Sequence, residues 1–263
     1  MTYAQYAALE GVNWSSLKWL WSGSPLHYRY HVDHPKADVD TPARVRFRAV
    51  HTAILEPEKF AEEYPIYSGG NRRSKEWDAF EAANAGKSIL KESEAATILE
   101  QAAAVRVHPA IRGWLKSGRA EVPFQWVEKN FGIACKGRAD LLCPGAVLDL
   151  KSVPSLDAAQ MARWICRMGY HLQLDHYAAG ARANGHEVQR VGIIGVESKA
   201  PYDSALFWLS DATMMKAADE RAELLLRLKG CMEVDFWPGR FMEEQTVDIP
   251  SYEGDLEISL EEA

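Results

Sequence analysis

Hydrophobic and polar residues recur with two different periods along the chain, and the change between the two periods is sharpest near residues 121–152. Two short apolar runs, 139–142 and 146–150, flank Cys143-Pro144-Gly145, where proline and glycine favour a tight reversal. A third β-like run precedes them and ends at Lys129-Asn130-Phe131-Gly132. The pattern predicts a three-stranded antiparallel meander whose last two strands form a hairpin.

Helical periodicity lies on both sides of this meander. Residues 42–57, 92–117, 156–184 (interrupted near Gly169) and 211–232 have apolar side chains at helical spacing, and 188–197 and 205–209 read as further strands. Residues 59–93 are polar and irregular. The order predicts an α/β fold with a mixed central sheet flanked by helices. We expect one domain over residues 1–241, with a helical N-terminal part to about 118 and a sheet core over about 119–241.

The hairpin contains the candidate chemistry. Side chains alternate across a strand, so Asp149 and Lys151 share one face while Leu148 and Leu150 point to the other. If the hairpin register brings Asp140 opposite them, two carboxylates and a lysine converge, which suits a divalent cation and a polarised water. A solvated ion pair is the alternative interpretation. The expected burial of Leu148 and Leu150 favours the metal site.

Composition narrows the class of protein. The chain has 263 residues, 47% of them hydrophobic, so it can bury a sizeable core. It contains neither an apolar run long enough to span a membrane nor a signal-peptide pattern, and we expect a soluble intracellular protein. Its four cysteines are scattered without a CxxC pair, which indicates neither a zinc site nor a disulfide framework.

The formal net charge of −7 is unevenly distributed. Residues 242–263 hold eight acidic residues and no lysine or arginine, so the first 241 residues carry 30 basic and 29 acidic side chains. This predicts an acidic, flexible C-terminal tail. Basic clusters elsewhere can follow a phosphate backbone, although ordinary solvated surface explains them equally well. The candidates for DNA binding are Arg44, Arg46, Arg48, Arg72, Arg73 and Arg138.

Four segments in this order resemble the PDDEXK nuclease superfamily: AVHTAILEP (49–57), CKGRADLL (135–142), LDLKS (148–152) and GYHLQLDHYAAG (169–180). The N-terminal WSSLKWLWSGSPLHYRY is similar to the branch with the exonuclease VIII (RecE) nuclease domain. Phage lambda exonuclease and the RecB nuclease domain are more distant relatives. The resemblance implies a restriction-endonuclease-like core.

The resemblance also implies roles for particular residues. Asp140 and Asp149 would bind Mg²⁺, with Mn²⁺ as a substitute, and the backbone carbonyl of Leu150 would add a ligand. Lys151 would activate the attacking water or stabilise charge on the phosphate. His51, which alone reads as a core histidine, becomes a further metal ligand. Gln173 and Tyr177 would position the lysine and the DNA end, and Glu121 is a possible upstream acidic residue.

One departure concerns His51. Relatives commonly have Gly-Thr-Ala-X-His before this histidine, whereas this chain has Phe47-Arg48-Ala49-Val50-His51. The packing of that helix can therefore differ from the family pattern. The four cysteines do not bracket the core, so no iron–sulfur cluster is expected. Without a Gly-rich Walker-type loop, no use of ATP is expected either.

The function implied is a Mg²⁺-dependent exodeoxyribonuclease that degrades one strand of linear duplex DNA, 5′ to 3′, and leaves 3′ overhangs for homologous recombination. A homo-oligomeric ring, a single-strand annealing protein as partner, and a bacterial or phage-infected cytoplasm are expected with it. The acidic tail is either a docking segment for that partner or a solubilising extension. Two other functions stay open: a PDDEXK endonuclease, and a non-catalytic scaffold that binds DNA ends.

Overall fold

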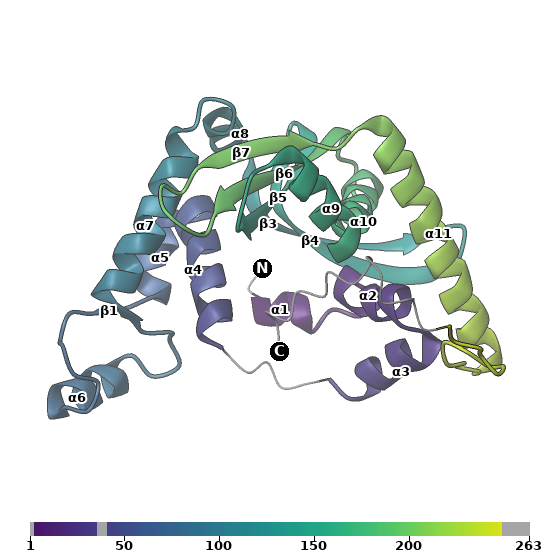
Figure 1. Cartoon of the computed structure of the whole chain (residues 1–263), viewed down its shortest axis with the longest axis horizontal. Helices are drawn as coiled ribbons and strands as arrows, with labels where there is room; N and C mark the ends of the chain where they lie inside the picture. Colours follow the sequence, from purple (N-terminus) through teal and green to yellow (C-terminus); the bar gives the residue numbers. More distant parts are fainter. Residues whose placement is uncertain (1–2, 36–40, 249–263) are drawn as a thin grey trace.

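The computed structural model describes residues 3–35 and 41–248, and a five-stranded sheet lies at its centre (Figure 1). The strand order is β3-β4-β5-β6-β7. The first three strands are antiparallel, β6 is parallel to β5, and β7 is antiparallel to β6. The meander and the mixed sheet are therefore confirmed. Their bounds are Arg119–Glu128 (β3), Ile133–Cys143 (β4), Gly145–Val153 (β5), Val188–Glu197 (β6) and Ser204–Trp208 (β7).

One face of the sheet is covered by α10 (Tyr170–Ala183), with α2 (Trp14–Ser22), α9 (Ala158–Met168) and α11 (Asp211–Val234) packed around it. The predicted interruption at Gly169 is confirmed: its φ of 70° ends α9 and starts α10. Close approach of α10 to β3 depends on Gly180, where an added Cβ would lie 2.7 Å from the Trp126 ring. Helix α3 (Pro25–Asp33) follows α2 and packs against it.

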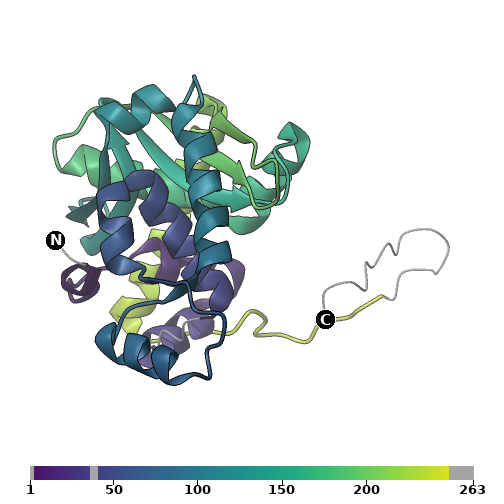
Figure 2. The same ribbon diagram turned by 90° about the vertical axis from the view of Figure 1, so that its left-hand side faces the viewer.

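The opposite face is covered by α4 (Pro42–Leu55) and α7 (Glu92–Val107), which lie together in front of the sheet in Figure 2. Thr41 caps α4, and Pro42 occupies its first turn, so the helix begins where the sequence predicts. Ala49, Val50, Ala53 and Ile54 form its buried face. This leaves the other side of α4 available to line a cleft. The short helix α8 (Arg112–Ser117) follows α7 and leads into β3.

Residues 59–93 are more regular than expected. They contain most of α5 (Pro57–Glu63), then β1 (Ile66–Tyr67), α6 (Lys75–Ala83) and β2 (Leu90–Lys91). β1 and β2 form a separate two-stranded parallel pair, and α6 stands away from the main sheet (Figures 1 and 2). The Tyr67 ring packs edge-on against Trp77, with centroids 5.0 Å apart. Such a small aromatic contact between distant residues leaves no periodic signal in the sequence.

Hydrogen bonds hold the start of the described chain, and the segment just after α11, against the body. Near the start, α1 (Tyr3–Ala7) is held by Lys136, whose Nζ donates to the carbonyls of Ala7 and Leu9. After α11, the chain passes α3, where the Leu26 amide donates to the Pro238 carbonyl. Residues 249–263, most of the predicted acidic tail, lie outside the described residues. Within the described ranges, no helix is both long and apolar enough to cross a membrane.

Candidate functional site

The hairpin opens where its two aspartates stand. Strands β4 and β5 are paired from Leu141 and Leu148 to the turn. If the same register is extended by one residue away from the turn, Asp140 lies opposite Asp149. At this point a side chain takes the place of a backbone acceptor: Asp140 Oδ2 accepts a hydrogen bond from the Leu150 amide at 2.8 Å. The structure thus brings the two predicted carboxylates close to each other.

Asp149 and Lys151 form a buried pair. Leu148 and Leu150 pack in the core beneath α4 and α7, so the alternate positions of β5 face α10. Lys151 Nζ lies 2.6 Å from Asp149 Oδ2 and 4.7 Å from the centroid of the Tyr170 ring. Burial raises the pKa of Asp149 to about 6, and the nearby Lys151 partly opposes this shift. Burial alone would lower the pKa of Lys151, but Asp149 and Asp140 together raise it, so the amine is protonated.

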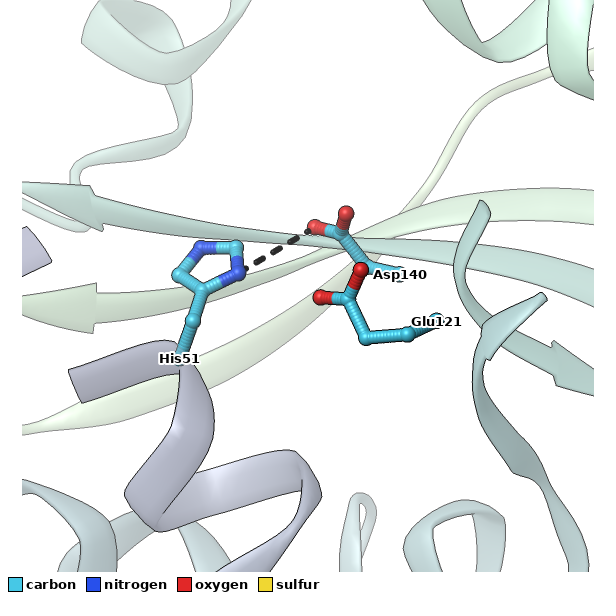
Figure 3. Close-up of side chains that lie close together, drawn as sticks. All are labelled: His51, Glu121 and Asp140. Carbon is cyan, nitrogen blue, oxygen red and sulfur yellow. Dashed lines mark ion pairs between the residues drawn. The ribbon is translucent and has the colours of Figure 1, made fainter. Parts of the chain in front are cut away.

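His51 and Glu121 complete the group from two other elements. Figure 3 shows His51, on α4, and Glu121, on β3, pointing toward Asp140. One ligand atom from each of these three residues lies within 4.8 Å of the others. Glu121 Oε2 is also 2.7 Å from Arg138 Nε. The three candidate ligands that lie closest together are therefore His51, Glu121 and Asp140. Asp149, which was predicted as a ligand, is instead paired with Lys151.

The hydrogen bonds of His51 fix which ring nitrogen faces the acids. Its Nε2 lies 3.0 Å from the Leu150 carbonyl oxygen, which can only accept, so the proton is on Nε2. The unprotonated Nδ1 then faces Asp140 Oδ2 across 3.7 Å. The Leu150 carbonyl, predicted as a ligand, therefore orients His51. A nitrogen lone pair opposite a carboxylate is unfavourable unless a cation lies between them.

The pKa shifts agree with this geometry. Burial, followed by the charge of Lys151, lowers the pKa of His51 to about 4, which keeps the ring neutral as a metal ligand requires. Burial, followed by the charge of Asp140, raises the pKa of Glu121 to about 7. In the described chain, the buried Oδ1 of Asp149 has no hydrogen-bond partner. These groups can hold a divalent metal ion.

Glu121 reaches this position through an irregular backbone. Ala120 pairs with Leu141 and Val122 with Ala139, so Glu121 lies opposite Asp140, but its φ of 52° breaks the ladder there. Ala139 and Leu141 pack in different core clusters, although side chains two apart in a regular strand share a face. Both strands are therefore distorted at the site, and sequence periodicity does not predict such a distortion.

A cleft with a volume of about 1410 Å³ opens over these residues. Among the predicted DNA-binding residues, Arg44, Arg48 and Arg138 line it. The others lie elsewhere: Arg46 Nη2 is 3.5 Å from the Ser198 carbonyl oxygen, and Arg72 binds the Ile89 carbonyl and covers the Trp77 ring. Arg73 is exposed in the loop before α6. The structure thus separates the arginine candidates into two groups.

The helix pair Gln173 and Tyr177 is placed as predicted on one side of α10. Gln173 lines the cleft, and its Nε2 donates to Tyr177 Oη at 2.9 Å. Burial raises the pKa of Tyr177 well above its ordinary value, so its hydroxyl stays protonated. Sequence reasoning missed other residues near the site or in the cleft wall. They are Phe47, Lys59 and Tyr64, of which helical spacing from His51 identifies Phe47. Tyr170, which helical spacing places on the same side of α10 as Gln173, lies at Lys151.

The chain belongs to a family described as a PDDEXK-like domain of unknown function (DUF3799), which matches residues 14–246. A search of curated proteins gives no match. Among solved structures, a Eubacterium rectale protein named "Putative exonuclease" is 18% identical, with a TM-score of 0.62 over 95% of this chain and 93% of its own. The family match and this likeness together confirm the PDDEXK-like fold.

Two other solved structures match more weakly. A phage-related exonuclease from Haemophilus somnus is 11% identical, with a TM-score of 0.36 over 88% of this chain and 100% of its own. An alkaline exonuclease from Laribacter hongkongensis is 12% identical, with a TM-score of 0.29 over 71% of this chain and 89% of its own.

Proposed function

We propose that the protein is a Mg²⁺-dependent exodeoxyribonuclease that hydrolyses one strand of linear duplex DNA. One observation carries this proposal: His51, Glu121 and Asp140 lie within 4.8 Å of one another in a cleft that also contains Lys151 and three arginines. Membership of a PDDEXK-like family supports it. The exonuclease names of the similar structures agree with this activity but do not establish it for this chain.

Each group has a distinct task in the proposed reaction. His51, Glu121 and Asp140 would hold the cation, with Asp149 close behind them; a bound Mg²⁺ polarises a phosphoryl oxygen and lowers the pKa of water. Lys151 holds its proton at Nζ and offers positive charge to the phosphate as negative charge develops. Arg44, Arg48 and Arg138 would neutralise the backbone on either side.

The finer features of the proposal come from the family resemblance. Digestion would run 5′ to 3′ and leave 3′ single-stranded overhangs for homologous recombination. The enzyme would act as a homo-oligomeric ring around DNA and pass the overhang to a single-strand annealing protein. Sedimentation analysis measures the oligomer. Deletion of residues 249–263 followed by pull-down of an annealing protein tests the docking segment, and unchanged binding would remove that role.

The decisive experiment uses linear duplex DNA labelled separately at its 5′ and 3′ termini, with a covalently closed circle as the second substrate. Wild type and Asp140→Asn are compared in Mg²⁺ and in EDTA. Asp78→Asn is the matched control, because this carboxylate is exposed on α6 and does not line the cleft. We expect early loss of the 5′ label by wild type and by the control, no cleavage in EDTA or by Asp140→Asn, and an intact circle.

Other outcomes identify the alternatives. Cleavage of the circle would establish an endonuclease. Early loss of the 3′ label would keep the exonuclease and reverse its polarity. Binding of DNA ends without cleavage in Mg²⁺ or Mn²⁺ would contradict the enzyme and leave the scaffold.

A further inference from the structure

Phe47 is an exposed aromatic ring in a cleft wall that is otherwise mostly polar. It lies on α4, one turn before His51, and 36% of its surface is exposed. Its ring centroid is 4.3 Å from that of His51, with an angle of 48° between the planes. Arg44, Arg48 and Thr52, its neighbours on this side of α4, also line the cleft.

Core packing does not explain this ring. The buried face of α4 consists of Ala49, Val50, Ala53 and Ile54, and Phe47 belongs to neither hydrophobic core cluster of the described residues. The exposed part of the ring, between Arg44 and Arg48 in the cleft wall, is open to contact with a ligand that enters the cleft. The ligand that fits must therefore offer a flat apolar face together with anionic groups for the flanking arginines.

A nucleotide has both features, because each base has a π-face and each linkage has a phosphate. Relying on the proposed nuclease function for the identity of the strand, we infer that Phe47 stacks on the nucleobase next to the scissile phosphate. The ring beside His51 then fixes the distance between that base and the metal site. Stacking needs a base face freed from its neighbour, so the contact is made by a base at a strand end or in an unpaired strand.

This contact specifies the kind of substrate without reading its sequence. Every base can stack on a phenyl ring, whereas a sugar–phosphate chain that lacks bases cannot. The cleft is therefore expected to bind a strand that carries bases more tightly than an abasic strand, whatever the base sequence. A purely structural role, in which Phe47 shields His51, makes a different prediction, since Leu at position 47 would shield the imidazole about as well.

The test measures binding in EDTA by fluorescence anisotropy, so that it does not depend on hydrolysis. The ligands are a labelled ten-nucleotide deoxythymidine oligomer and an oligomer of equal length made of abasic tetrahydrofuran residues. Wild type should bind the base-bearing oligomer about tenfold more tightly than the abasic one. Phe47→Ala and Phe47→Leu should bring this ratio close to one by weakening only the base-bearing complex. Phe47→Tyr, which keeps the ring, should retain the wild-type ratio.

Several results would overturn the inference: a wild-type ratio near one, an unchanged ratio in Phe47→Ala and Phe47→Leu, or an equal loss of affinity for both oligomers. Leu and Tyr are included because both keep a large side chain against His51. Incubating wild type with end-labelled linear duplex DNA in Mg²⁺ tests the proposed function separately. Absence of cleavage there would contradict the nuclease, while the binding ratio would still decide the role of Phe47.

Discussion

Glu121 shows at the scale of one residue how the site is built against local preference. Its φ of 52° lies in the left-handed region, which residues other than glycine and asparagine rarely adopt. The distortion places its carboxylate beside Asp140, where two like charges repel each other. The pKa of Glu121 is raised overall, so burial and this repulsion outweigh the ion pair with Arg138. A cation in this position would relieve the repulsion.

Replacing Glu121 by Gln should therefore stabilise the metal-free protein at pH 8 and weaken metal binding. The pKa of Glu121 rises from 4.5 to about 7 on folding, so stability is lost as pH rises through this interval. At pH 8 the charged form costs up to about 3 kcal/mol, and each recovered kcal/mol raises the melting temperature by about 2–4 °C. Thermal unfolding with and without Mn²⁺ measures both effects.

The matched control for this substitution is Glu81→Gln, on the exposed side of α6. It should leave the melting temperature and the increase caused by Mn²⁺ unchanged. Bound metal stabilises wild type by about 2.7 kcal/mol at a concentration of 100 Kd. A Glu121→Gln variant that kept the full increase would show that Glu121 is not a ligand.

At the scale of elements, a feature could be predicted when the residues that determine it are close together in the sequence. The hairpin followed from two apolar runs around Cys143–Gly145, and its register brought Asp140 to Asp149 as expected. Helix α4 begins and ends within two residues of the predicted 42–57. The contacts between β1 and β2 and the left-handed Glu121 depend on distant residues, so no local pattern predicts them. His51 could be identified only through the family resemblance, because an isolated histidine among apolar residues is more often part of the core.

Helix α4 also divides three predicted DNA-binding arginines between its two sides. Arg44 and Arg48 line the cleft, whereas Arg46, two residues from each, points toward Ser198. We expect Arg44→Gln and Arg48→Gln each to weaken DNA binding and to lower the slope of log K against log salt by about 0.9 for a duplex. Arg46→Gln, with the same change of charge on the same helix, should leave both unchanged.

Fluorescence anisotropy with a labelled duplex at 50–200 mM salt, in EDTA, measures this slope. Equal effects of all three substitutions would mean that the arginines act only through net charge. No effect of the first two would place the DNA path outside the cleft.

At the scale of the whole molecule, two buried polar side chains, Arg221 and His176, join the helices to the sheet. Arg221 on α11 binds Asp175 on α10 at 2.6 Å and Glu128 on β3 at 2.9 Å. At the next residue of α10, His176 Nε2 is 3.0 Å from the Lys136 carbonyl oxygen on β4. Because α10 lies between α11 and the sheet, loss of either contact would loosen one whole face of the domain rather than one loop.

His176 predicts how this assembly responds to acid. It is fully buried, packs against the Trp126 ring with centroids 4.8 Å apart, and is near the charges of Arg221 and Glu128. Burial, partly opposed by the hydrogen bond to the Lys136 carbonyl, lowers its pKa from 6.5 to about 4. Between these two values the unfolded chain takes up a proton that the native protein does not, so the free energy of unfolding falls as pH decreases.

His176 should therefore account for about 2 kcal/mol of the stability lost between pH 7.5 and pH 5. His176→Gln keeps a donor for the Lys136 carbonyl but has no proton to gain, so it should lower stability at pH 7.5 and lose about 2 kcal/mol less than wild type on acidification. Urea unfolding at the two pH values measures this difference. The control is His34→Gln at the exposed C-cap of α3, which should follow wild type at both pH values. Since His51 is present in all three proteins, its own titration cancels. An acid loss in His176→Gln equal to that of wild type would contradict a lowered pKa of His176 in the folded protein.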